Sequence, residues 1–207
     1  MGKFLLSLLA MLVGITSGAA ETEPKRDVNG LAPGMSVGDV IARLKQIGVG
    51  ANLYFATEES DGWDAFGKIH KVDSEQIEEF RRIGCISGRG DKGEDFTEVT
   101  CYKERDFYRL DFTRHLTSTH LKKIVYNFPS NLNSGEMMKN LRRQYRLGKA
   151  KPDDYNRFDL GDGYKLTMRQ RSVTSRSELT IISTHLWTVD AEAGRLARDR
   201  SNPEPGL

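Results

Sequence analysis

The sequence has no excess of charge of one sign and no long apolar run beyond its first residues. Its 207 residues include 31 lysines and arginines and 29 aspartates and glutamates, giving a formal net charge of +2. This intermixed balance gives no electrostatic reason to expect binding to nucleic acid or to an anionic membrane surface. After the first residues, no segment approaches the ~20 apolar residues that a membrane-spanning helix needs. We therefore expect no nucleic-acid partner and no membrane span in the processed chain.

Recognisable catalytic motifs are also missing. No serine lies in the G-x-S-x-G turn of the hydrolases, and the four histidines lack the spacing of zinc ligands. The sequence Gly161-Asp162-Gly163 is followed by a strand pattern rather than by a helix, which indicates a hairpin turn and not a phosphate-binding loop. These absences favour a non-enzymatic protein, and we predict no cofactor and no bound metal.

One group of residues leaves an enzymatic alternative open. His115 and His120 flank a predicted turn, and Asp111 precedes them in the same region. A hydrolase site assembled from such scattered residues would need a pocket that gathers the three side chains. We therefore keep a hydrolase as the alternative to the non-enzymatic interpretation.

The N-terminus has the pattern of a cleavable signal peptide. Lys3 is followed by the apolar run from Phe4 to Val13, and Ser17 to Ala20 offers small residues for cleavage. A buried N-terminal helix is the competing interpretation, but helix caps and polar-face residues are absent. We predict a signal peptide over residues 1–20 and a periplasmic or secreted location. No cysteine lies near the cleavage site, so lipid attachment is not indicated.

The two cysteines, Cys85 and Cys101, lie in the exported part of the chain. An even pair in an oxidising compartment predicts a disulfide, whereas two free thiols or a metal pair are the alternatives. Closing a loop of about 15 residues would stabilise the fold by about 3 kcal/mol on chain-entropy reasoning.

The first half of the chain predicts a helix followed by an antiparallel meander. Residues 21–33 combine proline, glycine and charge and predict a flexible lead-in. A helix should then begin after Ser36 and end near Gly48, because its apolar residues recur with helical spacing. From Phe96 to Phe128 the apolar residues alternate instead, as in half-buried strands. The expected buried side of the meander comprises Tyr108, Leu110, Phe112 and Leu116, then Ile124, Tyr126 and Phe128.

Weaker patterns complete the expected organisation. Residues 52–57 and 65–72 predict short strands, and residues 74–83 predict a helix capped by Ser74. The second half repeats the helix-then-strands order, with a helix capped by Ser134 and strands over 155–160, 164–171 and 179–189. We predict an α+β fold of two modules, residues 34–129 and 130–189, with helices packed on one face of the sheet or sheets, and a disordered tail over 190–207.

The stretch GMSVGDVIARLKQIG, with later strands of the form Y-x-L-x-F and L-x-x-I-x-Y, resembles a known periplasmic module. That module occurs in the SmpA/OmlA (BamE-like) outer-membrane assembly lipoproteins and, as a tandem pair, in the beta-lactamase inhibitor proteins (BLIP-like). The second repeat here lacks the G-M-S entry, and the lipid-attachment cysteine is missing. The resemblance implies helices on one face of an antiparallel meander, and by analogy a face that is free to bind a partner.

The polar side of the strands is where we expect binding. The candidate residues are Arg109, Asp111, His115, Lys165, Arg169 and Arg171. A face with several arginines suits a protein partner, since arginine is enriched at interfaces. The competing interpretation is that these residues form only the solvated side of a sheet. We expect an envelope or secreted protein as partner, and an accessory or inhibitor-like role.

Overall fold

The computed structural model describes residues 25–50, 60–88, 98–104, 106–128, 134–147, 156–169 and 177–201. Within these residues the helices are α1 (Val37–Gln46), α2 (Ser60–His70), α3 (Ser74–Arg82), α4 (Ser134–Gln144) and α5 (Thr184–Ser201). The strands are β1 (Cys85–Gly88), β2 (Glu98–Lys103), β3 (Asp106–Phe112), β4 (Leu121–Asn127), β5 (Asn156–Gly161), β6 (Tyr164–Arg169) and β7 (Glu178–Ser183). The predicted α+β class is confirmed.

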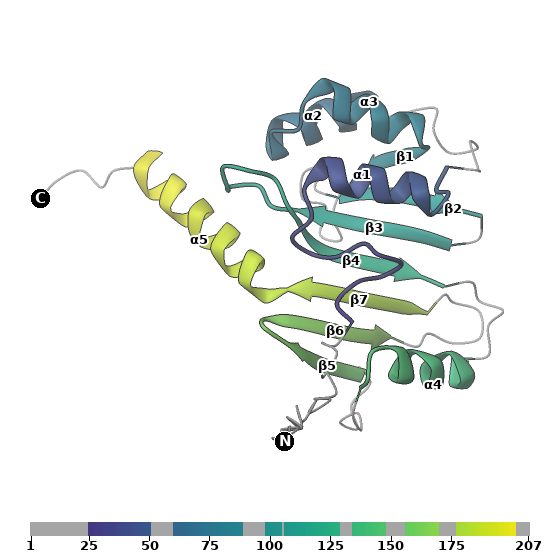
Figure 1. The fold of residues 1–207 in the computed structure, drawn as a ribbon. Coiled ribbons are helices and arrows are strands. Elements are labelled where there is room, and N and C mark those ends of the chain that lie inside the picture. Colours follow the sequence, from purple (N-terminus) through teal and green to yellow (C-terminus); the bar gives the residue numbers. More distant parts are fainter. Residues whose placement is uncertain are drawn as a thin grey trace, which may run out of the picture.

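All seven strands form one antiparallel sheet in the order β1-β2-β3-β4-β7-β6-β5 (Figure 1). Strands β1 to β4 come from the first half of the chain and β5 to β7 from the second half. The two halves meet where β4 pairs with β7, with Ile124 opposite Ile181. The two helix-and-strand units therefore share a single sheet.

One face of this sheet is apolar and covered. The register aligns one buried side chain from each of six neighbouring strands in a row: Val99, Leu110, Ile124, Ile181, Leu166 and Phe158. Buried residues of α1 to α4 belong to the same core cluster, among them Leu44, Phe66, Phe80 and Leu141. Figure 1 shows α1 across the β1–β3 end of the sheet and α4 beside β5. The predicted buried side of the middle strand is confirmed for Tyr108, Leu110 and Phe112, whereas Leu116 lies beyond the end of β3 and is half-buried.

Helix α1 begins and ends where its sequence predicts. The Ser36 hydroxyl accepts a hydrogen bond from the backbone N–H of Asp39, and Gly48 follows the last turn with a φ of +72°. A positive φ is easily adopted by glycine, so the chain can turn away at this point. Helix α3 also lies where it is predicted, but Asp73 is its N-cap rather than Ser74, because the Asp73 carboxylate accepts from the N–H of Gln76 at 2.8 Å.

The predicted strand over residues 65–72 is wrong, since these residues lie in and just after α2. Trp63, Phe66 and His70 fall three and four residues apart, and this spacing brings their rings to one side of a helix. There Trp63 stacks on Phe80 of α3, and Phe66 meets Phe112 of β3 edge to face. The short apolar pattern of this segment is compatible with either a strand or a helix. Aromatic packing on α3 and β3 therefore determines that the segment is a helix.

Residues 25–33 correct the predicted flexible lead-in. Val28 and Leu31 are buried and bond to each other's backbone around a tight turn at Asn29 and Gly30. The Asn29 side chain donates to the Tyr108 hydroxyl at 2.7 Å, and the Tyr145 hydroxyl donates to the Asp27 carbonyl at 2.6 Å. This segment thus links β3 to the α4 region, so it is part of the core despite its polar composition.

The predicted strand over 179–189 ends earlier than expected, and the predicted disordered tail begins with a helix. Strand β7 ends at Ser183, whose hydroxyl accepts from the backbone N–H of Leu186 at 3.2 Å as α5 begins. Ser183 thus acts as a helix cap, which the apolar run from Leu179 to Val189 conceals. Helix α5 continues to Ser201, and its last turns project from the body of the molecule (Figure 1).

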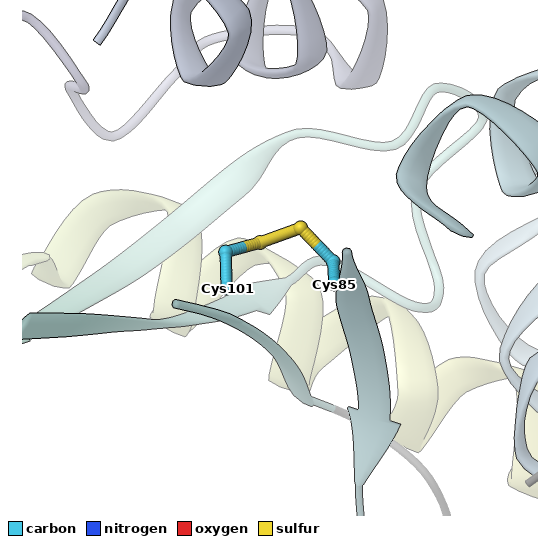
Figure 2. Close-up of a disulfide and its surroundings, with 2 residues drawn as sticks. All are labelled: Cys85 and Cys101. Atoms are coloured by element: carbon cyan, nitrogen blue, oxygen red, sulfur yellow. A yellow bond between two sulfur atoms is a disulfide. The ribbon is translucent and has the colours of Figure 1, made fainter. Parts of the chain in front are cut away.

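The predicted disulfide between Cys85 and Cys101 is present (Figure 2). The two cysteines are register partners of β1 and β2 and are both buried. Strand β1 was not predicted from the sequence, and it lies at the start of the expected loop between the two cysteines. The disulfide therefore joins two paired strands at the edge of the sheet.

Several predictions fall outside the described residues: the signal peptide, the strand over 52–57, Arg171 and the last six residues. Within the described residues, no helix is both long and apolar enough to cross a membrane.

Candidate binding face

The second face of the sheet is polar, and we call it the polar face. It is formed by the strand residues on the side opposite the core row, and five of them, Glu98, Asp111, Lys122, Val125 and Asn127, are themselves buried. From β2 to β4 these are Glu98, Thr100, Tyr102, Phe107, Arg109, Asp111, Lys122, Lys123, Val125 and Asn127. From β5 to β7 they are Arg157, Asp159, Lys165, Thr167, Arg169, Glu178, Thr180 and Ile182. Helices α1 to α4 place their buried residues in the core cluster on the other face.

Ion pairs cross the polar face from strand to strand. The Glu98 carboxylate lies 3.6 Å from the Lys123 ammonium, and the Arg109 guanidinium lies 3.2 Å from the Glu178 carboxylate. Both carboxylates are largely buried by their neighbours, so these pairs are less screened by solvent than ordinary surface pairs. The centre of the polar face is therefore held in a defined arrangement.

A bulge in the β3–β4 pairing places two consecutive lysines on this face. Asp111 pairs with Lys123 whereas Phe112 pairs with Leu121, so Lys122 is the extra residue. An extra residue in one strand breaks the alternation of side chains. Leu121 and Ile124 consequently both reach the core, and the two lysines between them turn to the polar side.

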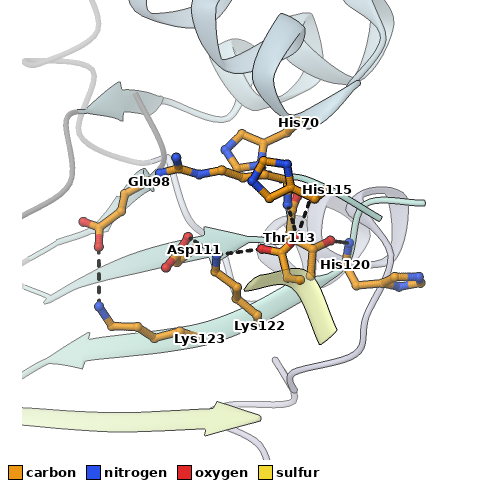
Figure 3. Close-up of polar contacts among 10 residues, drawn as sticks. His70, Glu98, Asp111, Thr113, His115, His120, Lys122 and Lys123 are labelled. Carbon is orange, nitrogen blue, oxygen red and sulfur yellow. Dashed lines mark hydrogen bonds and ion pairs between the residues drawn. The ribbon is translucent and has the colours of Figure 1, made fainter. Parts of the chain in front are cut away.

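Lys122 is the centre of a buried charged cluster at the end of the polar face (Figure 3). Its ammonium lies 3.2 Å from the Asp190 carboxylate of α5 and 3.6 Å from the Asp111 carboxylate of β3. It also lies 4.9 Å from the centre of the Trp187 ring. Lys122, Asp111 and Asp190 are each less than 9% exposed. One cation thus lies between two carboxylates from different elements and ties α5 to the sheet.

Asp190 also fastens α5 to the connection between β3 and β4. Its carboxylate accepts hydrogen bonds from the backbone N–H groups of Arg114 and His115, both at 2.7 Å. Burial acts to raise the pKa of Asp190, but these two N–H groups and Lys122 outweigh burial and hold the pKa below its usual value. The carboxylate is therefore ionised throughout the neutral range.

At Asp111 the effect of burial on the pKa prevails instead. Desolvation raises the pKa of Asp111 to about 6, although Lys122 and Lys123 act to lower it. The two aspartates beside Lys122 differ because Asp190 accepts backbone hydrogen bonds, whereas one buried oxygen of Asp111 has no hydrogen-bond partner. Asp111 is therefore the carboxylate of this cluster that gains a proton first on acidification.

The structure places most of the predicted binding residues on one surface. Arg109, Asp111, Lys165 and Arg169 all lie on the polar face, in strands β3 and β6. His115 lies beyond β3, where its ring packs against Gly194 of α5 so closely that a side chain at position 194 would collide with it.

The three residues of the enzymatic alternative have separate surroundings. Asp111 faces Lys122, and the His115 ring lies against α5. His120 has its Nδ1 at 3.2 Å from the Gly34 carbonyl and its Nε2 at 2.8 Å from the Ser118 hydroxyl. Among the described residues, no group of three histidine, cysteine or acidic side chains is arranged to hold a metal ion. In the described part of the chain, no hydrogen bond or ion pair joins the side chains of these three residues.

His70 is a titratable residue that the sequence analysis did not single out. It is fully buried among aromatic rings, and its Nδ1 lies 3.0 Å from the Thr113 carbonyl, which requires the proton on Nδ1. Burial lowers the pKa of His70 to about 4, against the opposing effect of that hydrogen bond. His70 is therefore a neutral core residue at pH 7.

An aromatic pair on the polar face was not predicted from the sequence. Tyr102 and Phe107 are register partners of β2 and β3, and their ring centres lie 5.8 Å apart. Both are half-buried and stand two residues from the ion-paired row that contains Arg109. Alternation along the strands does place them on the face opposite Cys101 and Tyr108, but the predicted binding residues are all polar and do not include this pair.

The fold and this surface define a disulfide-linked α+β protein whose single antiparallel sheet is apolar on one face and polar on the other. No protein family, curated protein or solved structure matches the chain. The resemblance to the SmpA/OmlA and beta-lactamase inhibitor modules therefore stays a prediction.

Proposed function

We propose that this chain is an exported, non-enzymatic protein that binds another protein through the polar face of its sheet. The observation that carries the proposal is the composition of that face, in which the Tyr102–Phe107 pair adjoins the Arg109–Glu178 ion pair. Aromatic residues and arginine are the residue types that dominate binding energy at protein interfaces. Because cross-strand pairs already hold these side chains, little conformational entropy would be lost on binding.

The signal-peptide pattern and the disulfide support a periplasmic or secreted location. Disulfides persist in oxidising compartments and are rare in the cytosol, and the Cys85–Cys101 bridge joins two strands of this sheet. An envelope accessory or inhibitor-like role suits a protein of this kind. Mass measurement of the protein recovered from its cells tests the signal peptide. If residues 1–20 are removed, the mature chain begins at Glu21.

Site-specific photocrosslinking in cells of the source organism tests the binding face. A photoreactive residue at Thr100 or Thr180 would lie on the polar face, whereas one at Glu75 or Lys139 would lie on the exposed surface of α3 or α4. We expect discrete adducts with the same partner from the first two positions and none from the other two. Equal adducts from all four positions, or none from any, would remove the polar face as the binding surface.

Substitution provides a second, independent measurement. Replacing Tyr102 and Arg109 by alanine should abolish the adduct formed from Thr180, because truncating interface anchors of this type costs roughly 2 kcal/mol or more each. The matched control replaces Ile77 and Arg81, an apolar and a cationic residue of α3 outside the polar face. A control that loses the adduct as completely would show that the loss reflects general destabilisation.

A further inference from the structure

A serine and a histidine in the connection between β3 and β4 lie in hydrogen-bond contact. The Ser118 hydroxyl lies 2.8 Å from Nε2 of His120, and Nδ1 of His120 lies 3.2 Å from the Gly34 carbonyl oxygen. Because a carbonyl oxygen can only accept, Nδ1 has the ring proton. In the neutral ring, Nε2 therefore offers a lone pair to the Ser118 O–H. A hydroxyl, an imidazole base and a group that orients the base are the parts of an activated serine nucleophile.

The backbone around His120 holds its ring in place. The Thr113 N–H donates to the His120 carbonyl at 2.9 Å, and the His120 N–H donates to the Thr113 hydroxyl at 2.9 Å (Figure 3). Gly34 is fixed separately, since its N–H donates to the Leu121 carbonyl at 2.7 Å. Ser36 also forms an isolated antiparallel bridge with His120. Two segments 86 positions apart in the chain therefore fix the base against the carbonyl that orients it.

Ser118 is accessible to a reagent, unlike a serine that the fold uses as a helix cap. It is exposed, and His120 beside it is half-buried. Ser183, by contrast, is buried and caps α5. Ser201 is exposed like Ser118, but its hydroxyl donates to the Ala197 carbonyl at 3.1 Å, and a carbonyl does not act as a base at neutral pH. Ser118 thus combines access with a base, and Ser201 supplies a matched reference.

We propose that Ser118 is a reactive serine that takes an acyl group from an activated ester, with His120 as the base. The Ser118 oxygen forms a bond to the ester carbonyl carbon as its proton passes to Nε2 of His120. The bond from that carbon to the leaving oxygen then breaks, and the leaving group takes the proton from Nε2. The products are O-acylated Ser118 and a free alcohol or phenol, so atoms and charges balance and no other reactant is needed.

This inference goes beyond the proposed function and does not depend on it. Acylation is a single reaction of the chain without turnover, which is compatible with a non-enzymatic binding protein. Ser118 lies in the connection after β3 and not among the strand residues of the polar face. A positioned base accelerates such reactions about 10²–10⁴-fold, so Ser118 should react at least about 100-fold faster than Ser201.

Acetylation of the purified, processed protein by p-nitrophenyl acetate tests the proposal. Samples taken over time are digested, and peptide fragmentation locates each acetyl group, because lysines also react with this ester. We expect Ser118 to be acetylated about 100-fold faster than Ser201. Equal rates at the two serines, or no acetyl group on Ser118, would overturn the proposal.

Matched variants test the base. His120→Gln keeps a polar side chain but removes the base, so the acetylation rate of Ser118 should fall about 100-fold, to that of Ser201. His185→Gln makes the same change at an exposed histidine of α5 and should leave the rate at Ser118 unchanged. An unchanged rate in His120→Gln, or an equal loss in both variants, would show that His120 is not the base. Thermal unfolding of both variants verifies that they are folded.

Nitrogen NMR measures the position of the ring proton in the unsubstituted protein. The chemical shifts of the histidine ring nitrogens report which nitrogen has the proton, and the spectrum of His120→Gln identifies the signals of His120. We expect the neutral His120 ring to have its proton on Nδ1. A neutral ring with its proton on Nε2 would overturn the proposal, because Nε2 could not then accept the proton of Ser118.

Discussion

The two faces of the single sheet use opposite means to hold the same strands together. The covered face aligns apolar side chains from six strands in a row, and helices α1 to α4 complete its core. The polar face instead joins strands by ion pairs, and in the part of the chain that the structure describes the cluster around Lys122 is the one whose charged members are all buried. Burial of apolar area dominates folding stability, whereas surface ion pairs contribute little. We therefore expect the covered face to determine stability and the polar face to be available for binding.

The largest effect should come from the covered face. Phe112→Ala removes a ring that meets Phe66 and Phe80 edge to face in the core, and such truncations cost about 3–5 kcal/mol of unfolding free energy. The control, Thr180→Ala on the polar face, should change the free energy by less than about 0.5 kcal/mol. Urea denaturation measures both, and equal losses would contradict the division of roles between the faces.

The charged cluster should be the exception on the polar face. Lys122→Ala takes the buried cation away from both Asp111 and Asp190, and removal of one partner from a buried ion pair costs about 3–5 kcal/mol. Lys123→Ala, at the neighbouring and more exposed ion pair, should cost roughly 1 kcal/mol. If the two variants unfold at the same urea concentration, Lys122 does not fasten α5 to the sheet.

The disulfide ties the edge strand β1 to its neighbour and should contribute an intermediate amount. Replacing Cys85 and Cys101 together by alanine should lower the unfolding free energy by about 3 kcal/mol, because the open chain has more conformational entropy when unfolded. The same loss is expected when the wild type is measured with a reductant. A reductant that also destabilises the double variant would point to a cause other than the bridge.

Acid should act on the two faces in opposite directions. His70 has its pKa lowered to about 4, so its contribution to stability is present above its ordinary pKa of 6.5 and is lost as the pH falls towards 4. Asp111 has its pKa raised to about 6, so its contribution is present below its ordinary pKa of 3.8 and is lost as the pH rises through 6. Between these limits the two dependences largely cancel in the wild type.

Single substitutions should separate these two dependences. Between pH 6.5 and pH 4, Asp111→Asn should lose roughly 2–3 kcal/mol more stability than the wild type, because His70 then acts alone. The variant His70→Asn should instead gain stability over the same interval. Urea denaturation at several pH values measures both, and parallel pH profiles for the two variants would contradict the assignment.

The smallest effect is expected at the ion pair in the middle of the polar face. Arg109→Ala should cost no more than about 1 kcal/mol, since its pair with Glu178 is partly exposed. The charge-swapped variant Arg109→Glu with Glu178→Arg should recover most of this loss. Failure to recover it would mean that neighbouring charges, rather than the pair itself, set the free energy at this position.

Local patterns predicted the parts of the fold whose neighbours are close in the chain. The cap at Ser36, the turn at Gly48 and the hairpin at Gly161 to Gly163 depend on residues within a few positions, and each is present. Alternation also predicted which side of β3 is buried. For the same reason it placed four of the six candidate binding residues on one face.

Errors occurred where a distant contact outweighed the local pattern. Trp63 and Phe66 made residues 60–70 a helix because their rings pack on Phe80 and Phe112. Val28 and Leu31 lie in the core because two distant tyrosines bond to their segment. Tyr108 bonds to Asn29, and Tyr145 bonds to Asp27. Asp190 holds α5 against the connection after β3, a contact between residues about 75 positions apart in the chain. None of these partners can be read from the neighbouring sequence.

By itself, the sequence determined that this protein is built from capped helices and alternating strands, that its two cysteines suit a disulfide, and that its charges balance. These properties follow from spacing, residue type and composition, which act locally or as sums. The tertiary structure alone decided that β4 pairs with β7 to make one sheet, and that Lys122 meets Asp111 and Asp190. Such pairings depend on how distant segments meet when the shared apolar face is buried, and no local pattern encodes that meeting.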